Sequence, residues 1–504
     1  MKTTNNKFLD DDKFYNTKTK VGVVLPIWNQ EKKYVYECIN AIDTQLFRDF
    51  KLVIVIDGAN PETVSHIVNA SRDLTIPYKI IFRDINKGIA FSLNEGFSFL
   101  EDCKYLTWIS SDNRQYSNSL NVLVSEMDNS SDNTVLVYSM FNLINKFSTR
   151  LEDKDRLKFM TPFMQRPKEQ IIQNSFIGPS FLFKGESFVE SGRYNIKYET
   201  VEDYEFWIRL VKLGNIKFIP TALMDYRIGG DYSYTTLIPS EQISIRSADA
   251  SYEHRLIQNE VPKVTVIISA NNEEKYICQS INSVINQTYQ DFQLIIIDDA
   301  SNDNTWFRIN QIYNKKIMAI RLNSNRGKAS AMNLALEYAL GQYILELDGD
   351  DWIEPNTLEV MVAQMDSLPA NIALCYGNRK IWFEKNEGLM EGPIYLGMSY
   401  KDKYEIIKSV ATHCPRFYRK ICLNSVGGWP TNNINDERNI IEDLNLTLNL
   451  AEKYDFYYIN QTLYNQRRHN ANITKTEIDK CTKQIESLVT EKLLKWGNSV
   501  QGSL

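Results

Sequence analysis

The sequence lacks paired cysteines, a long apolar run and an excess of positive charge. Its seven cysteines are scattered and never spaced as Cys-x-x-Cys, which favours reduced thiols over disulfides or a zinc site. No window approaches the roughly 18 apolar residues that a membrane span needs, and residues 1–20 contain no apolar core of signal-peptide length. These absences predict a cytoplasmic protein and leave open a peripheral attachment to a membrane.

The composition predicts packed globular domains. Apolar residues make up 43% of the chain and aromatic residues 12%, which is ample for large cores. The net charge of −6 excludes nucleic-acid binding through a broad basic face. At roughly 150 residues per domain, a chain of 504 residues predicts two or three domains.

The chain contains one local design twice, since YLTWISSDNR (105–114) resembles YILELDGDDW (343–352). A constant shift pairs further residues without a gap: Asn29 with Asn271, Glu31 with Glu273, Lys33 with Lys275, Tyr34 with Tyr276, Ile39 with Ile281, Asn40 with Asn282, Gln45 with Gln287, Asp49 with Asp291 and Phe50 with Phe292. Farther on, NKGIAFSLN (86–94) matches NRGKASAMN (325–333). Ordered matches with so little drift predict a duplicated domain of roughly 240 residues.

Each copy alternates strands and helices. Residues 21–27 and 51–57 are short, continuously apolar runs, as in parallel strands that are buried on both faces. The segment between them has helical spacing. This alternation predicts an α/β sheet whose ligand lies at the carboxyl ends of the strands. Such runs precede Asp57, Asp112, Asp299 and Asp350, so we expect these residues at that edge.

Shifts in composition predict the domain boundaries. Residues 1–18 are polar and predict a flexible tail. Residues 19–230 and 263–475 predict the two domains, joined by a linker at 231–262 that mixes polar turns with a short helix. Residues 476–504 predict an amphipathic helix and tail that cover the second domain.

Asp348 and Asp350 form an Asp-x-Asp motif at the end of an apolar run. Side chains two residues apart on an extended segment point the same way. Magnesium or manganese takes one or two carboxylates together with substrate phosphates. The motif therefore fits a metal–diphosphate complex, although DGDD alone is more often a solvated turn.

The remaining candidates are weaker when each is taken singly. Asp57 and Asp299 could accept a hydrogen bond from a nucleobase N–H, or they could simply cap a helix. Glu202–Asp203 and Glu442–Asp443 begin predicted helices, where the helix dipole already favours acids. The pair recurs at the same position along both copies of the repeat, which favours a functional role.

In this order the motifs resemble a family 2 glycosyltransferase domain with the GT-A fold. The matching features are the asparagine after the first strand, the strand-end aspartate, the N-[KR]-G segment, the Asp-x-Asp position and the downstream Glu-Asp helix. Two such domains in one chain resemble bacterial two-domain polysaccharide synthases such as chondroitin polymerase. The resemblance covers nearly the whole chain apart from the tail, the linker and the last helix.

The resemblance implies roles for residues of the second copy. Asp299 would bind the uracil of a UDP-sugar, with Asn325 in the same site, and Asp348 would hold the sugar or its ribose. The implied ligands of Mn²⁺ or Mg²⁺ are Asp350, Asp348 and His469. Asp443, or its neighbour Glu442, would be the general base for an inverting transfer to a glycan or glycoconjugate acceptor.

The first copy departs from this pattern. Its implied residues are Asp57, Asn86 and Asp112 for the nucleotide-sugar, Asp112 for the metal, and Asp203 and Glu202 for catalysis. Ser110 replaces the leading aspartate, and no histidine follows Arg227 at the corresponding place. We therefore hypothesise a duplicated sugar-transfer site with one copy retuned. The alternative is that only the second copy is catalytic and the first binds carbohydrate or a partner.

Two other enzyme classes fit less well. A dehydrogenase would have G-x-G-x-x-G after the first strand, and neither copy has it. A nucleotidyltransferase usually has a glycine-rich, basic loop there, whereas this chain reads IWNQEKK and SANNEEK.

Overall fold

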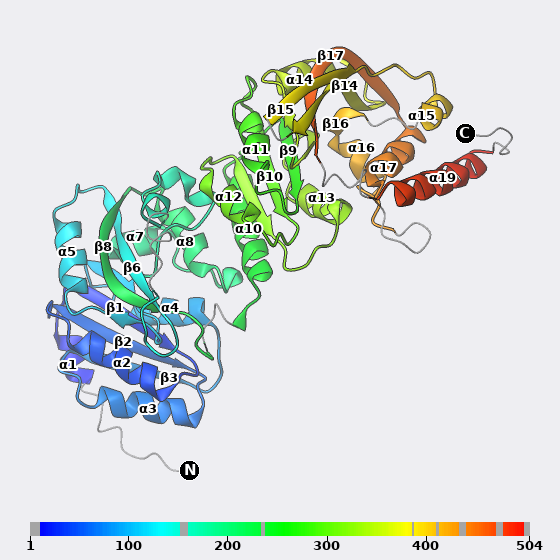
Figure 1. Ribbon diagram of the computed structural model, residues 1–504. Coiled ribbons are helices and arrows are strands. Elements are labelled where there is room, and N and C mark those ends of the chain that lie inside the picture. Colours follow the sequence, from blue (N-terminus) through cyan, green and yellow to red (C-terminus); the bar gives the residue numbers. More distant parts are fainter. Residues whose placement is uncertain are drawn as a thin grey trace. The chain divides into compact units, whose positions relative to one another are not determined.

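The structure is a computed structural model of the chain (Figure 1). It describes residues 11–151, 160–232, 237–385, 388–409, 413–432, 440–469 and 477–497. The chain divides into unit 1, Met1–His254, and unit 2, Arg255–Leu504.

Unit 1 is built on a mixed sheet. Its strands are β1 (Val21–Ile27), β2 (Phe50–Asp57), β3 (Tyr78–Arg83), β4 (Tyr105–Trp108), β5 (Arg114–Gln115), β6 (Thr134–Ile144), β7 (Phe181–Lys184) and β8 (Asn215–Arg227). Its helices are α1 (Asp11–Asn16), α2 (Lys32–Asp43), α3 (Pro61–Ser71), α4 (Ile89–Ser98), α5 (Ser119–Asp128), η1 (Lys168–Ile172), α7 (Gly185–Glu190), η2 (Ile196–Tyr198) and α8 (Glu202–Leu210). The strand order is β3-β2-β1-β4-β7-β6-β8-β5.

Unit 2 is also built on a mixed sheet. Its strands are β9 (Val264–Ala270), β10 (Phe292–Asp298), β11 (Ile317–Arg321), β12 (Tyr343–Asp348), β13 (Trp352–Ile353), β14 (Ile372–Lys385), β15 (Gly388–Tyr395), β16 (Cys414–Arg419) and β17 (Asp455–Arg468). Its helices are α11 (Ile277–Ile285), α12 (Thr305–Gln311), α13 (Lys328–Glu337), α14 (Thr357–Ser367), α15 (Lys403–Ser409), α16 (Lys420–Ser425), α17 (Glu442–Ala451) and α19 (Ile478–Lys495). The strand order is β11-β10-β9-β12-β16-β14-β17-β13, with β15 added on β14.

The two sheets have the same topology. Each position in the order of unit 1 is taken in unit 2 by the strand with the corresponding place in the chain. β1 is parallel to β2 and β4, as β9 is to β10 and β12. This confirms the predicted α/β class and the tandem arrangement of two domains.

One predicted correspondence between the copies is wrong. The Asn29 side chain accepts a hydrogen bond from the Asn60 N–H at 2.8 Å, and the Asn272 side chain accepts one from the Asn302 N–H at 2.8 Å. Asn29 therefore corresponds to Asn272 and not to Asn271. The ungapped match fails because the loop after the first strand is one residue longer in unit 1.

Helices cover both faces of the unit 1 sheet. Val21, Val23 and Leu25 of β1 pack in a cluster with residues of α2, α3 and α5, whereas Val24 packs in a second cluster with residues of α4 and α8. Both faces of β1 are buried, which explains its continuously apolar sequence. The loops at the carboxyl ends of β1, β2 and β4 meet at one edge, where α/β sheets bind ligands.

The predicted flexible tail needs a correction. Residues 11–16 form α1, and the Phe14 side chain is fully buried in the core of unit 1. The Lys51 ammonium lies 5.1 Å from its ring centroid. The aromatic anchor orders this part of the tail despite its polar sequence. Residues 1–10 lie outside the described residues.

The predicted linker contains helix α10 (Ser240–Ile257), and the division between the units falls within it. In the predicted C-terminal segment, α19 packs Leu488 and Val489 against Leu444 and Leu448 of α17. Residues 233–236 of the linker, and residues 476 and 498–504 of the C-terminal segment, lie outside the described residues.

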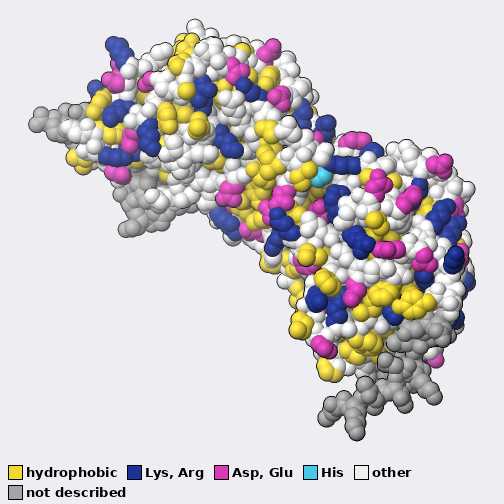
Figure 2. Space-filling view, turned by 180° about the vertical axis from the view of Figure 1, so that it is seen from behind, with side chains coloured by type: hydrophobic (Ala, Val, Ile, Leu, Met, Phe, Trp, Pro, Cys, Tyr) yellow, Lys and Arg dark blue, Asp and Glu magenta, His cyan; other side chains and the backbone are white. Residues whose placement is uncertain are grey.

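Over the described ranges, none of the helices combines the length and apolarity required to cross a bilayer. On the face seen in Figure 2, basic and acidic side chains are interspersed with apolar ones.

Candidate active site

Asp299 follows β10 and holds the loop before α13. Its carboxylate accepts hydrogen bonds from the N–H groups of Arg326 at 2.7 Å and Gly327 at 2.8 Å. Gly327 has a φ of +89°, a conformation that favours glycine. The loop also contains Asn325, which is exposed. The structure thus brings Asp299 and the N-R-G segment together at the expected edge of the sheet.

Asp57 has the same position in unit 1. Its carboxylate accepts hydrogen bonds from the N–H groups of Lys87 and Gly88 at 3.0 Å each, and it pairs with Arg83 at 2.9 Å. Asn86 is exposed, and its side chain accepts the Gly88 N–H at 2.9 Å. Both strand-end aspartates therefore fix a loop at the edge of their sheet.

Asp348 ends β12 within a network of charged side chains. Lys328 contacts Asp348 and lies 2.9 Å from Glu346, which is fully buried. Arg416 Nη2 lies 2.9 Å from Glu346 and 3.0 Å from Asp348. Desolvation raises the pKa of Asp348, but the charges of Lys328 and Arg416 outweigh it and hold that pKa well below its usual range. Sequence patterns do not indicate Arg416, whereas Lys328 lies in the repeated NRGKASAMN segment.

Arg416 also contacts Asp443 in the first turn of α17. Its Nη1 lies 3.3 Å from Asp443 Oδ2, so one guanidinium joins Asp348 to Asp443. Burial raises the pKa of Glu442 to about 7, with Lys328 opposing this rise and Asp443 adding to it. The structure therefore brings two of the predicted residues, Asp348 and Asp443, to one arginine.

Asp350 and His469 meet at the end of β17. Asp350 Oδ2 lies 2.9 Å from His469 Nε2, and the imidazole packs 4.8 Å from the Tyr276 ring. In the described part of the chain, no group of three or more His, Cys, Asp or Glu side chains is arranged to hold a metal ion. Asp350 and His469 would therefore supply two ligands, and oxygens from substrate or water would complete a cation's shell.

The charge around Asp350 suits a cation. Burial raises the pKa of the Glu273 carboxyl to about 8, and the nearby charges of Asp350, Asp348 and Asp303 raise it further in the same direction. Such an excess of negative charge would be neutralised by a divalent cation. The oxygen of Asp350 and the ring nitrogen of His469 are donors that manganese accepts. The residues present therefore fit the metal that the resemblance implies.

An arginine fastens the turn after the Asp-x-Asp position in both units. The Arg467 backbone N–H donates to the Asp351 carboxylate at 2.7 Å, and the Arg467 Nε donates to the backbone carbonyl of Asp350 at 3.0 Å. In unit 1 the Arg227 backbone N–H donates to Asn113 Oδ1 at 3.0 Å, and the Arg227 Nε donates to the backbone carbonyl of Asp112 at 2.9 Å. Burial and two nearby aspartates raise the pKa of Asp351 well above its usual value. Asn113 takes the place of Asp351 in unit 1, and its amide oxygen accepts the corresponding arginine N–H.

The last asparagine of the repeated N-[KR]-G segment has a structural role. The Asn94 side chain exchanges two hydrogen bonds with the Tyr194 backbone, at 2.8 and 3.0 Å. The Asn333 side chain does the same with the Trp429 backbone, at 2.8 Å each. The Trp429 indole then donates to Glu346 at 3.0 Å. Tyr194 and Trp429 therefore occupy corresponding places.

In unit 1 the predicted catalytic pair begins α8. Asp203 Oδ1 accepts hydrogen bonds from Trp108 Nε1 at 3.2 Å and from the Tyr194 hydroxyl at 3.1 Å. Burial raises the pKa of Asp203 to about 6, against the lowering effect of these two hydrogen bonds. Burial also raises the pKa of Asp112, to which the Ser110 hydroxyl donates at 2.6 Å.

Strand register and motif position identify the residues that replace the charged network in unit 1. The replacements are Trp108 for Glu346, Phe181 for Arg416, Ile89 for Lys328, Ser110 for Asp348 and Gly229 for His469. Removing one partner of a buried ion pair leaves the other charge unpaired, which destabilises the fold by about 3–5 kcal/mol. The two acids and two bases of the network are replaced together, which avoids that cost.

Both units of the chain match one family of known proteins. The profile described as Glycosyl transferase family 2 matches residues 22–189 and 265–427. An uncharacterized glycosyltransferase of Rickettsia felis is 24% identical over 397 residues, covering 69% of this chain and 64% of the relative. A chondroitin synthase of Pasteurella multocida is 28% identical over 264 residues, covering 52% of this chain and 25% of the relative.

A third relative is a UDP-Glc:alpha-D-GlcNAc-diphosphoundecaprenol beta-1,3-glucosyltransferase of Escherichia coli. It is 40% identical over 119 residues, covering 23% of this chain and 46% of the relative. The chain spans less than two thirds of the length of each of these relatives. Because the family profile matches more than half of the chain, in both units, the chain belongs to glycosyl transferase family 2. The predicted family resemblance is confirmed.

Proposed function

We propose that this chain transfers a sugar from a nucleotide-diphosphate sugar, most simply a UDP-sugar, to a hydroxyl of a glycan or glycoconjugate. The observation that carries the proposal is the position of Arg416, which joins Asp348 at the donor side of unit 2 to Asp443 at the start of α17. Asp350 and His469 pair in the same unit. A donor and an acceptor would therefore meet between groups that hold a diphosphate and a group that takes a proton.

Asp443 is the proposed general base of unit 2. Arg416 holds its carboxylate, with Nη1 3.3 Å from Oδ2, whereas burial raises the pKa of the neighbouring Glu442 to about 7. The acceptor O–H proton moves to the Asp443 carboxylate while the acceptor oxygen bonds to the anomeric carbon. The bond from that carbon to the diphosphate breaks, and its electron pair leaves with the nucleoside diphosphate. Attack from the face opposite the leaving group inverts the anomeric configuration.

Asp350 and His469 would hold Mn²⁺ or Mg²⁺, which supplies Lewis-acid stabilisation of the leaving diphosphate. Asp299 and Asn325 would line the nucleotide end of the site. Asp348 would orient the sugar or ribose, because Lys328 and Arg416 hold its carboxylate in place.

The relatives support the class of donor and acceptor. The name of the Escherichia coli relative includes a UDP-linked sugar and a lipid-linked sugar acceptor, and the Pasteurella multocida relative is named as a polysaccharide synthase. A surface glycan, extended at the membrane face, is therefore the proposed product. The family profile matches both units, which supports transfer in each of them over a purely binding role for unit 1.

Metal binding by the full chain tests the assignment in unit 2. Asp350→Ala is expected to weaken Mn²⁺ binding at least about tenfold in the presence of UDP, because it removes the oxygen of a two-ligand set. Isothermal titration calorimetry measures the Mn²⁺ affinity, and release of UDP from UDP-glucose measures turnover. Asp455→Ala is the matched control, since Asp455 begins the strand that His469 follows and its carboxylate accepts from Asn371. Unchanged Mn²⁺ affinity and turnover in Asp350→Ala would refute the assignment.

A further inference from the structure

The two units orient the carboxylate at the start of the Glu-Asp helix with different groups. In unit 2 the Arg416 guanidinium lies 3.3 Å from Asp443. In unit 1 the groups within hydrogen-bonding distance of Asp203, in the described residues, are the neutral Trp108 indole and Tyr194 hydroxyl. A cation in one copy is thus replaced by two neutral donors in the other.

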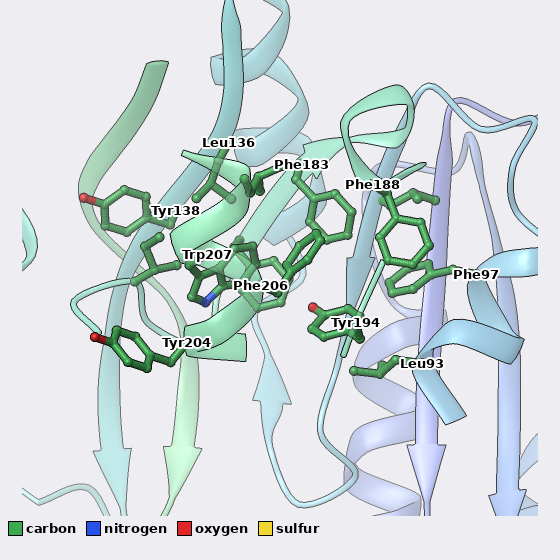
Figure 3. Packing of buried hydrophobic residues seen from close by; sticks show 14 of the residues in the cluster. Leu93, Phe97, Leu136, Tyr138, Phe183, Phe188, Tyr194, Tyr204, Phe206 and Trp207 are labelled. Atoms are coloured by element: carbon green, nitrogen blue, oxygen red, sulfur yellow. The ribbon is translucent and has the colours of Figure 1, made fainter. Parts of the chain in front are cut away.

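These two donors are held firmly in place. The Trp108 ring packs edge-on against Phe181, with centroids 6.1 Å apart. Tyr194 stacks on Phe206 at 4.5 Å and lies near Phe97 and Phe188, as Figure 3 shows. Asn94 binds the Tyr194 backbone on both its N–H and its carbonyl. Side chains fixed by packing and by a backbone clamp orient a carboxylate with little loss of entropy.

We propose that unit 1 is a second transfer site in which Trp108 and Tyr194 are positioning residues for the base Asp203. This inference rests on the proposed function, since it assigns the same proton transfer to a second carboxylate. The proton of the acceptor hydroxyl moves to Asp203, the acceptor oxygen bonds to the anomeric carbon, and the diphosphate leaves with the electron pair of the broken bond. The coordinated replacement of the charged network, rather than loss of single partners, supports a site that is retuned.

The surroundings of Asp203 determine how this site responds to pH. Glu202 and Glu205 lie on the same helix, and Glu199 precedes it. Arg209 is paired with Glu205 at 2.7 Å. Burial raises the pKa of Asp203 to about 6, and the bonds from Trp108 and Tyr194 act in the opposite direction. Because the base must be ionised, turnover by unit 1 should fall as the pH drops through about 6.

The test uses the full chain with Asp443→Asn, which removes the proposed base of unit 2. Release of UDP from UDP-glucose and UDP-GlcNAc is followed with Mn²⁺ between about pH 5 and pH 9. Residual turnover is expected, with an acid limb near pH 6. Adding Trp108→Phe or Tyr194→Phe should lower kcat several-fold at unchanged KM. Each should move the acid limb upward by about half a unit or more, because a hydrogen bond to the ionised carboxylate is lost.

Tyr204→Phe is the matched control. Tyr204 is a buried tyrosine next to Asp203, and its hydroxyl donates to the Ile172 carbonyl at 2.8 Å. Its loss should leave the pH profile unchanged. Thermal unfolding of each variant separates effects on the site from effects on folding.

The outcomes distinguish the two proposals. If Asp443→Asn abolishes all turnover, unit 1 is not a transfer site, while the proposed function of unit 2 stands. If a chain with both Asp203→Asn and Asp443→Asn keeps its turnover, or if the unaltered chain has none, the proposed function itself is wrong. If Trp108→Phe and Tyr194→Phe change kcat and the acid limb no more than Tyr204→Phe does, the positioning role is wrong.

Discussion

Glu346 has no solvent exposure, yet it is surrounded by groups that stabilise its charge. Lys328 and Arg416 lie at 2.9 Å, and the Trp429 indole donates at 3.0 Å. An isolated carboxylate at such a position would be strongly disfavoured. The network thus explains why β12, an otherwise apolar strand that leads into the Asp-x-Asp motif of unit 2, contains the acid Glu346.

Arg416→Met is expected to lower the free energy of unfolding by about 3–5 kcal/mol, because it removes the ion-pair partner of Glu346 and Asp348. Chemical denaturation of the full chain measures this. Lys263→Met is the control, since the pair of Lys263 with Asp366 is partly exposed and should contribute no more than about 1 kcal/mol. Equal effects of the two substitutions would contradict the buried-network interpretation.

At the residue scale, the sequence predicts the acids better than their partners. Asp350, Asp443 and Asp203 could be named because they recur at fixed depth in both copies. Arg416 and Tyr194 could not be named from the sequence. Strand pairing brings Arg416 to the site, and the hydrogen bonds from Asn94 to the Tyr194 backbone hold Tyr194 there. A single sequence contains no local signal for either.

At the scale of elements, α19 is attached to unit 2 through Glu452 at the end of α17. Lys492 Nζ lies 2.8 Å from one carboxylate oxygen, and Lys495 Nζ lies 2.7 Å from the other. Desolvation raises the pKa of Glu452, but the hydrogen bonds from these two lysines outweigh it and bring the pKa to about 2. This folded-state pKa is below the value of about 4.3 for an unfolded chain.

Glu452 should therefore stabilise the protein above about pH 4.3, and this contribution should be lost as the pH falls toward 2. We expect Glu452→Gln to destabilise the chain near neutral pH and to have little effect near pH 2. Urea denaturation at several pH values measures the difference. Glu486→Gln, an exposed position on α19, is the control and should show no such dependence. A Glu452→Gln effect that does not vary with pH would argue against this attachment.

At the scale of the whole molecule, each unit has its own core. The cluster around Phe183 draws on residues of unit 1, and the cluster around Phe417 draws on residues of unit 2. Both side chains are fully buried. A chain with separate cores is expected to unfold in more than one step.

Phe183→Ala and Phe417→Ala form a matched pair. Each should cost about 3–5 kcal/mol through lost burial and a cavity. Differential scanning calorimetry is expected to show one transition lowered by Phe183→Ala and a different one lowered by Phe417→Ala. A single transition that both substitutions lower equally would contradict independent cores.

The sequence by itself determines the duplication, the α/β class and the order of the candidate acids, because periodicity and repeated motifs are local properties of each segment. Tertiary structure decides which groups meet those acids. Asp350 and His469 are 119 residues apart, and Trp108 and Asp203 are 95 apart, so strand pairing and helix packing alone bring them within hydrogen-bonding distance. The loop that is one residue longer after β1, the buried Phe14 and the exchange of Arg416 for neutral donors likewise depend on how the segments pack.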